Sequence, residues 1–206
     1  MFRQRAPRSA AQRLAMAVVA VLTLALGYYL GYRLGGPGAH TPSSPQALVA
    51  AGESRDLADL ELTDHYGKPF GAEQLADRWS LLAFAHPADT EQVRAALTRL
   101  VFVHNRLVDQ PALQKAFRGL VVALDPVTDP AQLRELVDID SPDFLGVSGE
   151  RDVVARLTPD AARDGPPGGL ALVDPRHRLV GWFTPDTPPA TIAGDLKALA
   201  RAPAAD

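Results

Sequence analysis

The 206-residue chain contains no cysteine. A disulfide, a thiolate metal site and thiol catalysis are therefore excluded. The absence does not indicate a compartment, because exported proteins need not carry disulfides. The sequence also lacks a Gly-x-Ser-x-Gly motif and a glycine-rich phosphate-binding loop. Hydrolase and kinase-type activities thus have no signature here, and we expect a protein that is not an enzyme.

Acidic residues are missing from the first quarter of the chain. Residues 1–52 contain five arginines and no Asp or Glu, so residues 53–206 hold the other 16 basic and all 24 acidic side chains. The larger part therefore has a net charge of about −8. Because phosphate binding needs a basic face, this charge argues against a nucleic-acid partner.

A long uncharged segment follows the first arginines. Residues 14–32 hold no charged side chain, and four arginines precede them. At 1.5 Å per residue such a helix spans roughly the 30 Å hydrocarbon core of a membrane. The arginines favour a cytoplasmic N-terminus, and tyrosines suit the outer interface. The alternative is a cleaved signal peptide, whose apolar core is usually shorter.

This segment sets the expected organisation of the chain. We expect a basic cytoplasmic tail (1–13), a transmembrane anchor (14–34), a flexible Gly/Pro/Ser linker (35–52) and a folded domain (53–206). The anchor would lie in a bacterial cytoplasmic membrane, with the domain on the periplasmic, extracytoplasmic side.

Three glycines at the end of the predicted anchor are spaced four residues apart. Gly27, Gly31 and Gly35 lie on one helix face, and this spacing allows a homodimer through close helix approach. The simpler alternative is that glycine is common near the ends of such helices.

Strand and helix patterns alternate through the folded domain. Buried-strand patterns occupy 57–64, 79–85, 119–125, 144–148, 169–174 and 178–183, and helical patterns occupy a segment that starts after Asp89, then 129–137, 149–157 and 188–200. Alternation of this kind predicts a parallel sheet, with the late hairpin adding antiparallel strands. The fold class is therefore α/β, a central mixed sheet flanked by helices, as in the thioredoxin-like fold.

Several stretches in this order resemble the Sco/SenC family. They are "LTDHYGKPF", "DRWSLLAFAHPAD", "VVALDPVTDPAQL", "FLGVSGERDVVARL" and "GLALVDPRHRLVGWF", between about residues 57 and 200. The resemblance implies a membrane-anchored, thioredoxin-like protein that helps to assemble the copper centre of cytochrome c oxidase.

The metal ligands implied by this resemblance are absent. In the family they are two cysteines in a C-x-x-x-C turn and a histidine before the late hairpin. The matching positions here hold Pro87, Glu91 and Pro166. The family's mode of Cu(I) binding and its thiol–disulfide exchange are therefore excluded, and we expect no cofactor.

A few side chains near the lost ligands remain candidates. His86, Asp89 and Glu91 lie within six residues and could hold a hard or borderline metal ion. The simpler interpretation is that Asp89 caps the following helix in a capping box with Gln92, Glu91 complements the helix dipole and His86 belongs to the turn.

Other candidates have equally simple structural explanations. Asp125 and Asp129 are expected to cap or end local structure rather than act as an acid–base pair. Trp182 and Phe183, followed by Pro185, Pro188 and Pro189, either form a binding patch or pack in the core. The remaining histidines are expected on the surface: His40, His65, His104 and His177.

Two functional hypotheses follow. The first is a non-redox member of the Sco/SenC type, an accessory or scaffold whose partners are respiratory oxidase subunits or other assembly factors. The second is a copper-binding protein with a rebuilt, sulfur-free site near His86.

Overall fold

The computed structural model describes residues 44–127, 129–137, 141–158 and 168–202. The described residues form an eight-stranded mixed sheet in the order β1-β8-β7-β4-β5-β6-β2-β3. The strands are β1 (Val49–Asp56), β2 (Leu62–Asp64), β3 (Pro69–Phe70), β4 (Trp79–Ala85), β5 (Phe117–Ala123), β6 (Phe144–Ser148), β7 (Leu170–Val173) and β8 (Arg178–Phe183).

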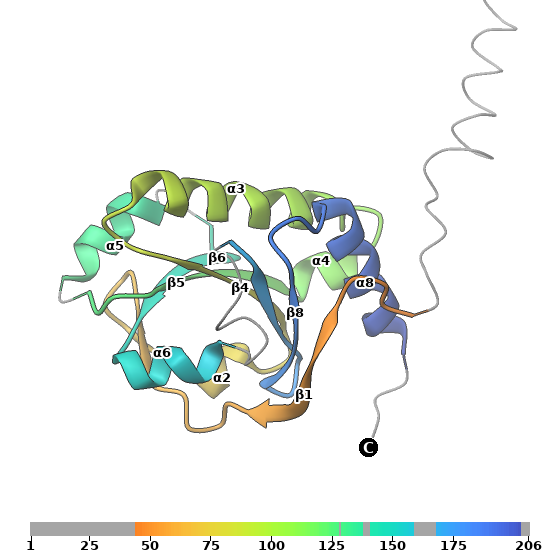
Figure 1. Ribbon diagram of the computed structural model, residues 1–206, viewed down its shortest axis with the longest axis horizontal. Helices are drawn as coiled ribbons and strands as arrows, with labels where there is room; N and C mark the ends of the chain where they lie inside the picture. The colour runs from red at the N-terminus through yellow and green to blue at the C-terminus, as the bar shows by residue number, and fades with distance from the viewer. Residues whose placement is uncertain (1–43, 128, 138–140, 159–167, 203–206) are drawn as a thin grey trace, which may run out of the picture. The chain divides into compact units, whose positions relative to one another are not determined.

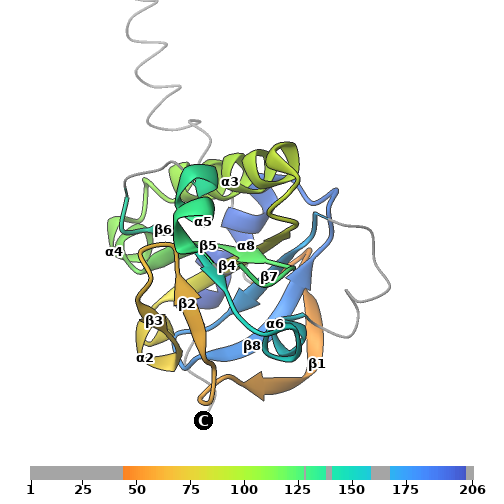
Figure 2. The same ribbon diagram turned by 90° about the vertical axis from the view of Figure 1, so that its left-hand side faces the viewer.

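Helices cover both faces of this sheet (Figures 1 and 2). One face packs on α3 (Thr90–Asn105), α4 (Pro111–Lys115), α5 (Pro130–Val137) and α8 (Pro189–Arg201). The other face packs on α2 (Ala72–Leu75) and α6 (Arg151–Leu157). Alternate residues of the central strands feed the two cores: Leu81 of β4 faces the first core and Leu82 faces the second.

The three central strands are parallel, as the alternation predicts. β4 pairs with β5 and β5 with β6 in parallel, whereas β7 runs antiparallel to β4 and forms a hairpin with β8. Strands buried on both faces need near-continuous apolar sequence, and β4 and β6 have it. The mixed sheet flanked by helices is thus confirmed.

The predicted first strand and linker are partly wrong. The strand placed at 57–64 is confined to 62–64, and residues 49–52, assigned to the linker, lie in β1. β1 pairs antiparallel with β8 at the edge of the sheet. Its sequence, VAAGESRD, has no apolar alternation, so its strand character comes from the pairing rather than from local pattern.

A buried carboxylate fixes the chain just before β1. Asp195 of α8 is 0% exposed. It accepts hydrogen bonds from three successive backbone N–H groups, those of Gln46 (2.8 Å), Ala47 (2.8 Å) and Leu48 (3.0 Å). Because a buried charge needs such partners, the folded domain begins at Gln46 or before it.

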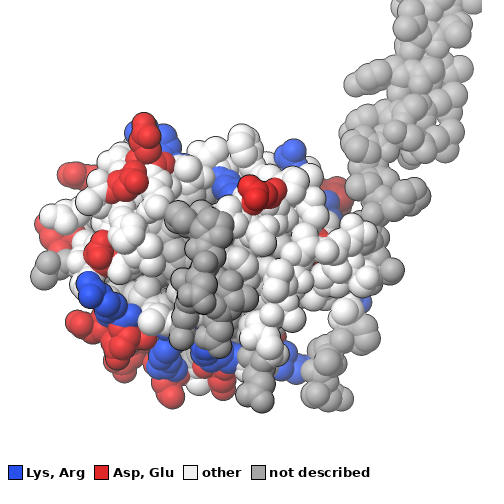
Figure 3. Space-filling model, viewed as in Figure 1, with Lys and Arg blue, Asp and Glu red and all other residues white. Residues whose placement is uncertain are grey.

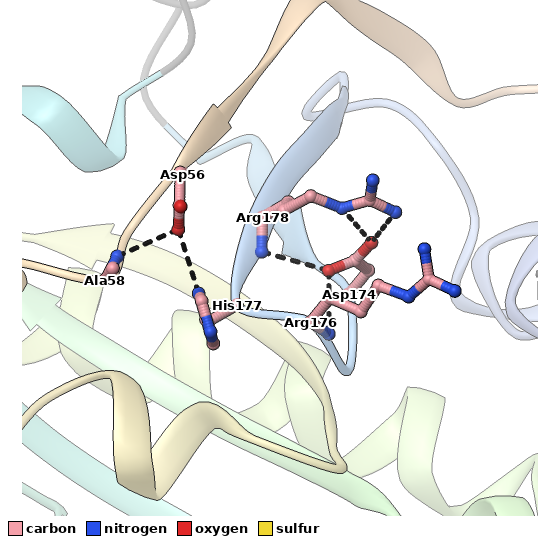
Figure 4. Close-up of polar contacts among 6 residues, drawn as sticks. All are labelled: Asp56, Ala58, Asp174, Arg176, His177 and Arg178. Atoms are coloured by element: carbon pink, nitrogen blue, oxygen red, sulfur yellow. Dashed lines mark hydrogen bonds and ion pairs between the residues drawn. The ribbon is translucent and has the colours of Figure 1, made fainter. Parts of the chain in front are cut away.

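The other end of β1 is tied to the β7–β8 turn (Figure 4). Asp56 Oδ1 lies 2.9 Å from His177 Nδ1. Within the turn, Asp174 accepts the backbone N–H groups of Arg176 and Arg178 and binds the Arg178 guanidinium at 2.9 and 2.7 Å. The edge strand is thus held at both ends by side chains of other elements.

His65 is buried, against the expectation of a surface histidine. It is 3% exposed, and its Nδ1 accepts the Gly146 N–H at 2.8 Å. Its own backbone N–H donates to the Gly146 carbonyl at 2.9 Å, which extends the β2–β6 pairing. Burial lowers the pKa of His65 below its usual 6.5; Asp64 opposes this shift and Arg134 adds to it.

In the part of the chain that the structure describes, no helix is long and apolar enough to cross a membrane. The predicted anchor at 14–34, with Gly27, Gly31 and Gly35, lies outside the described residues. His40 lies outside them as well.

Replacing the buried carboxylate tests its role in holding β1. Asp195→Asn puts an amide N–H₂ against backbone donors, so at least one of them loses its acceptor. We expect the free energy of unfolding to fall by about 3 kcal/mol in urea denaturation. The exposed Asp152 on α6 is the control, and Asp152→Asn should change stability by less than about 0.5 kcal/mol. Equal effects of the two variants would contradict the assigned role.

The histidine in the β2–β6 contact predicts a pH dependence. The pKa of His65 in the folded protein lies below 6.5. The stabilisation that the neutral His65 ring gives to the fold is therefore complete above pH 6.5, and it is lost as the pH falls through the folded-state pKa. Asn at this position keeps an acceptor near Nδ1 but does not titrate. The unfolding free energy of the wild type should therefore fall relative to that of His65→Asn below about pH 6.5. Parallel stability curves for the two proteins between pH 5 and 8 would contradict this.

Candidate functional site

The turn between β4 and α3 and the first turn of that helix hold Pro87 and Glu91, two of the positions predicted to match metal ligands. Asp89 donates its backbone N–H to the His86 carbonyl at 2.9 Å, and its side chain accepts the Gln92 N–H at 2.9 Å. The predicted helix cap is confirmed. The predicted reciprocal bond of a capping box is wrong: the Gln92 side chain accepts the His86 N–H at 2.6 Å rather than that of Asp89.

His86 pairs with a carboxylate from the neighbouring strand end. Its Nδ1 lies 2.9 Å from Asp125 Oδ2, and both side chains are about half exposed. His86 follows β4 and Asp125 follows β5, and the two strands are parallel. The carboxyl ends of parallel strands meet at one edge of a sheet, where ligands commonly bind in open α/β sheets. The position of both residues just after predicted parallel strands was visible in the sequence, but Asp125 was expected only to cap or end local structure.

The three predicted candidates do not converge on one point. Asp89 is engaged in the cap, and Glu91 is exposed in the first turn of α3. Within the described ranges, no group of three or more His, Asp or Glu side chains is placed to hold a metal ion. Pro166, at the third ligand position, lies outside the described residues.

The predicted ligand positions cannot carry out thiol redox chemistry. Pro87 is half-buried directly after His86 and has no N–H to donate. The chain has no cysteine that could act as a nucleophile in this turn. What remains at this edge of the sheet is an imidazole–carboxylate pair, which can hold a proton or orient a histidine nitrogen toward a ligand.

Other predicted candidates are structural. Asp129 accepts the Ala131 N–H at 2.9 Å at the start of α5, so its predicted capping role is confirmed. Trp182 and Phe183 are buried, at 7% and 0% exposure, and belong to the two cores. His104 is half-buried against the rings of Phe117 and Phe144, and His177 is also half-buried.

A cavity of about 790 Å³ is lined by residues other than those of this turn. It is bounded by the β2–β3 edge, α2 and the start of α6, and by Pro126 and Val127. Among the described residues, the charged side chains that line it are Glu61, Glu73 and Glu150. His86 and Asp125 do not line it, although Pro126 directly follows Asp125.

Known proteins match this fold and this sequence. A protein of Stutzerimonas stutzeri named "Putative copper-binding protein" is 27% identical over an alignment of 141 residues that covers 62% of this chain and 68% of that protein. The crystal structure of yeast Sco1 with copper bound has a TM-score of 0.58 at 20% identity, covering 78% of this chain and 94% of its own.

A SCO1/SenC family lipoprotein from Bacillus anthracis str. Ames also has a TM-score of 0.58, at 18% identity, covering 77% of this chain and 100% of its own. At such identities the two structures establish the shared fold. The family model described as SCO1/SenC matches residues 50–161, which is more than half of the chain. The protein therefore belongs to the SCO1/SenC family.

Proposed function

We propose that this protein is a membrane-anchored, non-redox member of its family that acts as an accessory or scaffold in respiratory oxidase assembly. The observation that carries the proposal is a retained SCO1/SenC fold whose cysteine positions hold Pro87 and Glu91 in a chain without cysteine. A chain without cysteine cannot pass copper between thiolates or transfer electrons through a dithiol.

The retained order of the turn supports a role in recognition. Asp89 still caps α3, and the Gln92 side chain still holds the backbone of His86. The surface around the lost site is thus well defined although its ligands are gone. A partner that recognises the shape of the family could still bind it. The proposed partners are oxidase subunits or other assembly factors on the extracytoplasmic side of a bacterial cytoplasmic membrane.

Deletion of the gene is the direct test of this proposal. We expect the deletion strain to contain less assembled cytochrome c oxidase, measured as haem absorbance and oxidase activity per membrane protein. Both the wild-type gene and a His86→Ala variant should restore the level, because the scaffold role needs no metal ligand. Unchanged oxidase activity and copper content in the deletion strain would overturn the proposal.

The second candidate is copper binding through His86. The imidazole–carboxylate pair favours it, because a histidine that binds a metal commonly donates its other ring N–H to a carboxylate. With Nδ1 bound to Asp125, the Nε2 atom is the nitrogen left for a metal. The Stutzerimonas stutzeri relative carries a copper-binding name. Further ligands would then come from a partner protein.

A competition titration tests this second candidate. The protein is titrated with Cu(I) and Cu(II) against chelators of known affinity. If His86 binds copper, His86→Ala should abolish the binding and Asp125→Asn should weaken it about 10- to 100-fold. Asp129→Asn, which changes a capping carboxylate on another turn, is the control and should leave the affinity unchanged. The titration is carried out on the protein alone and on the protein in membranes that contain the oxidase. Failure of the wild type to compete with the chelators in both would dispose of the candidate.

A further inference from the structure

A groove of about 610 Å³ runs between α3 and the loop that joins β8 to α8. Its apolar lining consists of Ala95 and Phe102 from α3 and Pro185, Pro188 and Pro189 from the loop and the start of α8. Along α3 the lining extends from Glu91 to Phe102. The groove therefore starts at a lost ligand position and follows one side of α3 for about 16 Å, at 1.5 Å per residue.

Arg99 holds the two walls of the groove together. Its guanidinium donates to the carbonyls of Thr184 (2.8 Å) and Thr187 (2.9 Å), and also to the Gly168 carbonyl. Burial lowers the pKa of Arg99, although nearby Asp186 opposes the shift, but an arginine stays charged at any relevant pH. The charged guanidinium, tied to carbonyls of the opposite wall, fixes the position of that wall relative to α3.

The groove contains part of the predicted patch, the prolines that follow Trp182 and Phe183. Trp182 and Phe183 are buried, but the prolines that follow them do line a surface, and Phe102 provides its aromatic ring. Phe102 is 51% exposed, which makes it one of four large apolar side chains left exposed in the described part of the chain. An exposed aromatic ring in a groove is typical of a binding surface.

Charge argues against two of the simplest occupants. Residues 53–206 carry a net charge of about −8. On the face shown in Figure 3, charged side chains of both signs lie along the lower edge and at the upper left. Two copies of this domain repel each other, and so do the domain and an anionic lipid surface. Within the groove, by contrast, Arg94 and Arg99 match Glu91 and Asp186 in number. The groove itself is thus electrically neutral and suits an uncharged segment.

The place where the tether enters the domain argues for a partner at the membrane. Asp195 binds the backbone of Gln46, and Pro189 of the groove lies six residues before it on α8, about 9 Å along the helix. If the anchor ends at residue 34, eleven residues (35–45) separate it from Gln46, and a chain of that length spans at most about 40 Å. The groove is then held within reach of the extracytoplasmic parts of membrane proteins.

We propose that this groove docks an extended, apolar segment from the extracytoplasmic part of a membrane-protein partner. At about 3.3 Å per residue, the 16 Å along α3 accommodate roughly five residues of extended chain. The proposal rests on the proposed scaffold function and adds the surface and the chemistry of the partner segment.

Site-specific photo-crosslinking tests the proposal with the full-length protein, expressed in the cells from which its gene comes. A benzophenone amino acid replaces Phe102 in the groove or, as the matched control, Val108, which is 67% exposed and does not line the groove. We expect position 102, and not position 108, to crosslink to a membrane protein, with the attachment mapped by mass spectrometry to an apolar segment outside the bilayer.

Two charge variants on α3 test the same surface. Ala95→Glu places a carboxylate in the groove, whereas Asn105→Glu makes the same charge change on an exposed position outside it. We expect the crosslink yield at position 102 to fall at least tenfold with Ala95→Glu and to stay unchanged with Asn105→Glu. Thermal unfolding of both variants at the wild-type temperature establishes that the fold is intact.

The outcomes separate the docking surface from the scaffold function. A mapped crosslink to an oxidase subunit supports both proposals. A mapped crosslink to a different membrane protein supports the docking surface and counts against the oxidase role. A crosslink to a second copy or to lipid, equal yields at positions 102 and 108, or insensitivity to Ala95→Glu would overturn the docking proposal.

Discussion

The carboxylate of Asp195 determines where the folded domain starts. Fully buried itself, it accepts hydrogen bonds from three consecutive backbone N–H groups, those of Gln46, Ala47 and Leu48. This contact directs the chain into β1, and β1 then covers the edge of β8. Ala47 and Leu48 pack against the first hydrophobic core as a result. One side chain of α8 thus positions both the edge strand and part of the first core.

The elements that were predicted closely are those whose sequence is dictated by burial. β4 at 79–85, β6 at 144–148 and β8 at 178–183 match the predicted strands residue for residue. Continuous apolar runs leave little choice of structure in a doubly covered sheet. The cap of α3 at Asp89 was equally local, because an N-cap acts on residues two or three positions away.

The features that were missed depend on partners far away in the sequence. β1 needs β8 and Asp195, which lies 147 to 149 residues from the N–H groups that it binds. His65 is buried because Gly146, 81 residues away, donates to its ring. His86 and Asp125 meet only because β4 and β5 are adjacent and parallel. The contact between His86 and Asp125 could have been inferred from the predicted topology. The contacts of Asp195 and His65 could not, because no sequence pattern links residues so far apart.

The predicted ligand positions lie beside well-ordered contacts. Asp89 caps α3 after β4, and Arg99, on the same helix, ties the two walls of the groove together. The turn and the groove are thus built on one element. The SCO1/SenC fold is present here without cysteine, which fits the rule that function resides in sites rather than in the fold.

The Asp195 contact also determines how the domain bears mechanical load. A pull on the chain from the N-terminal side reaches Gln46 before it reaches any residue of β1. The three hydrogen bonds to Asp195 lie between that point and β1, so they must break before β1 is peeled from β8. A force applied there would thus fall first on one buried side chain of α8, and the sheet would stay intact until that contact fails.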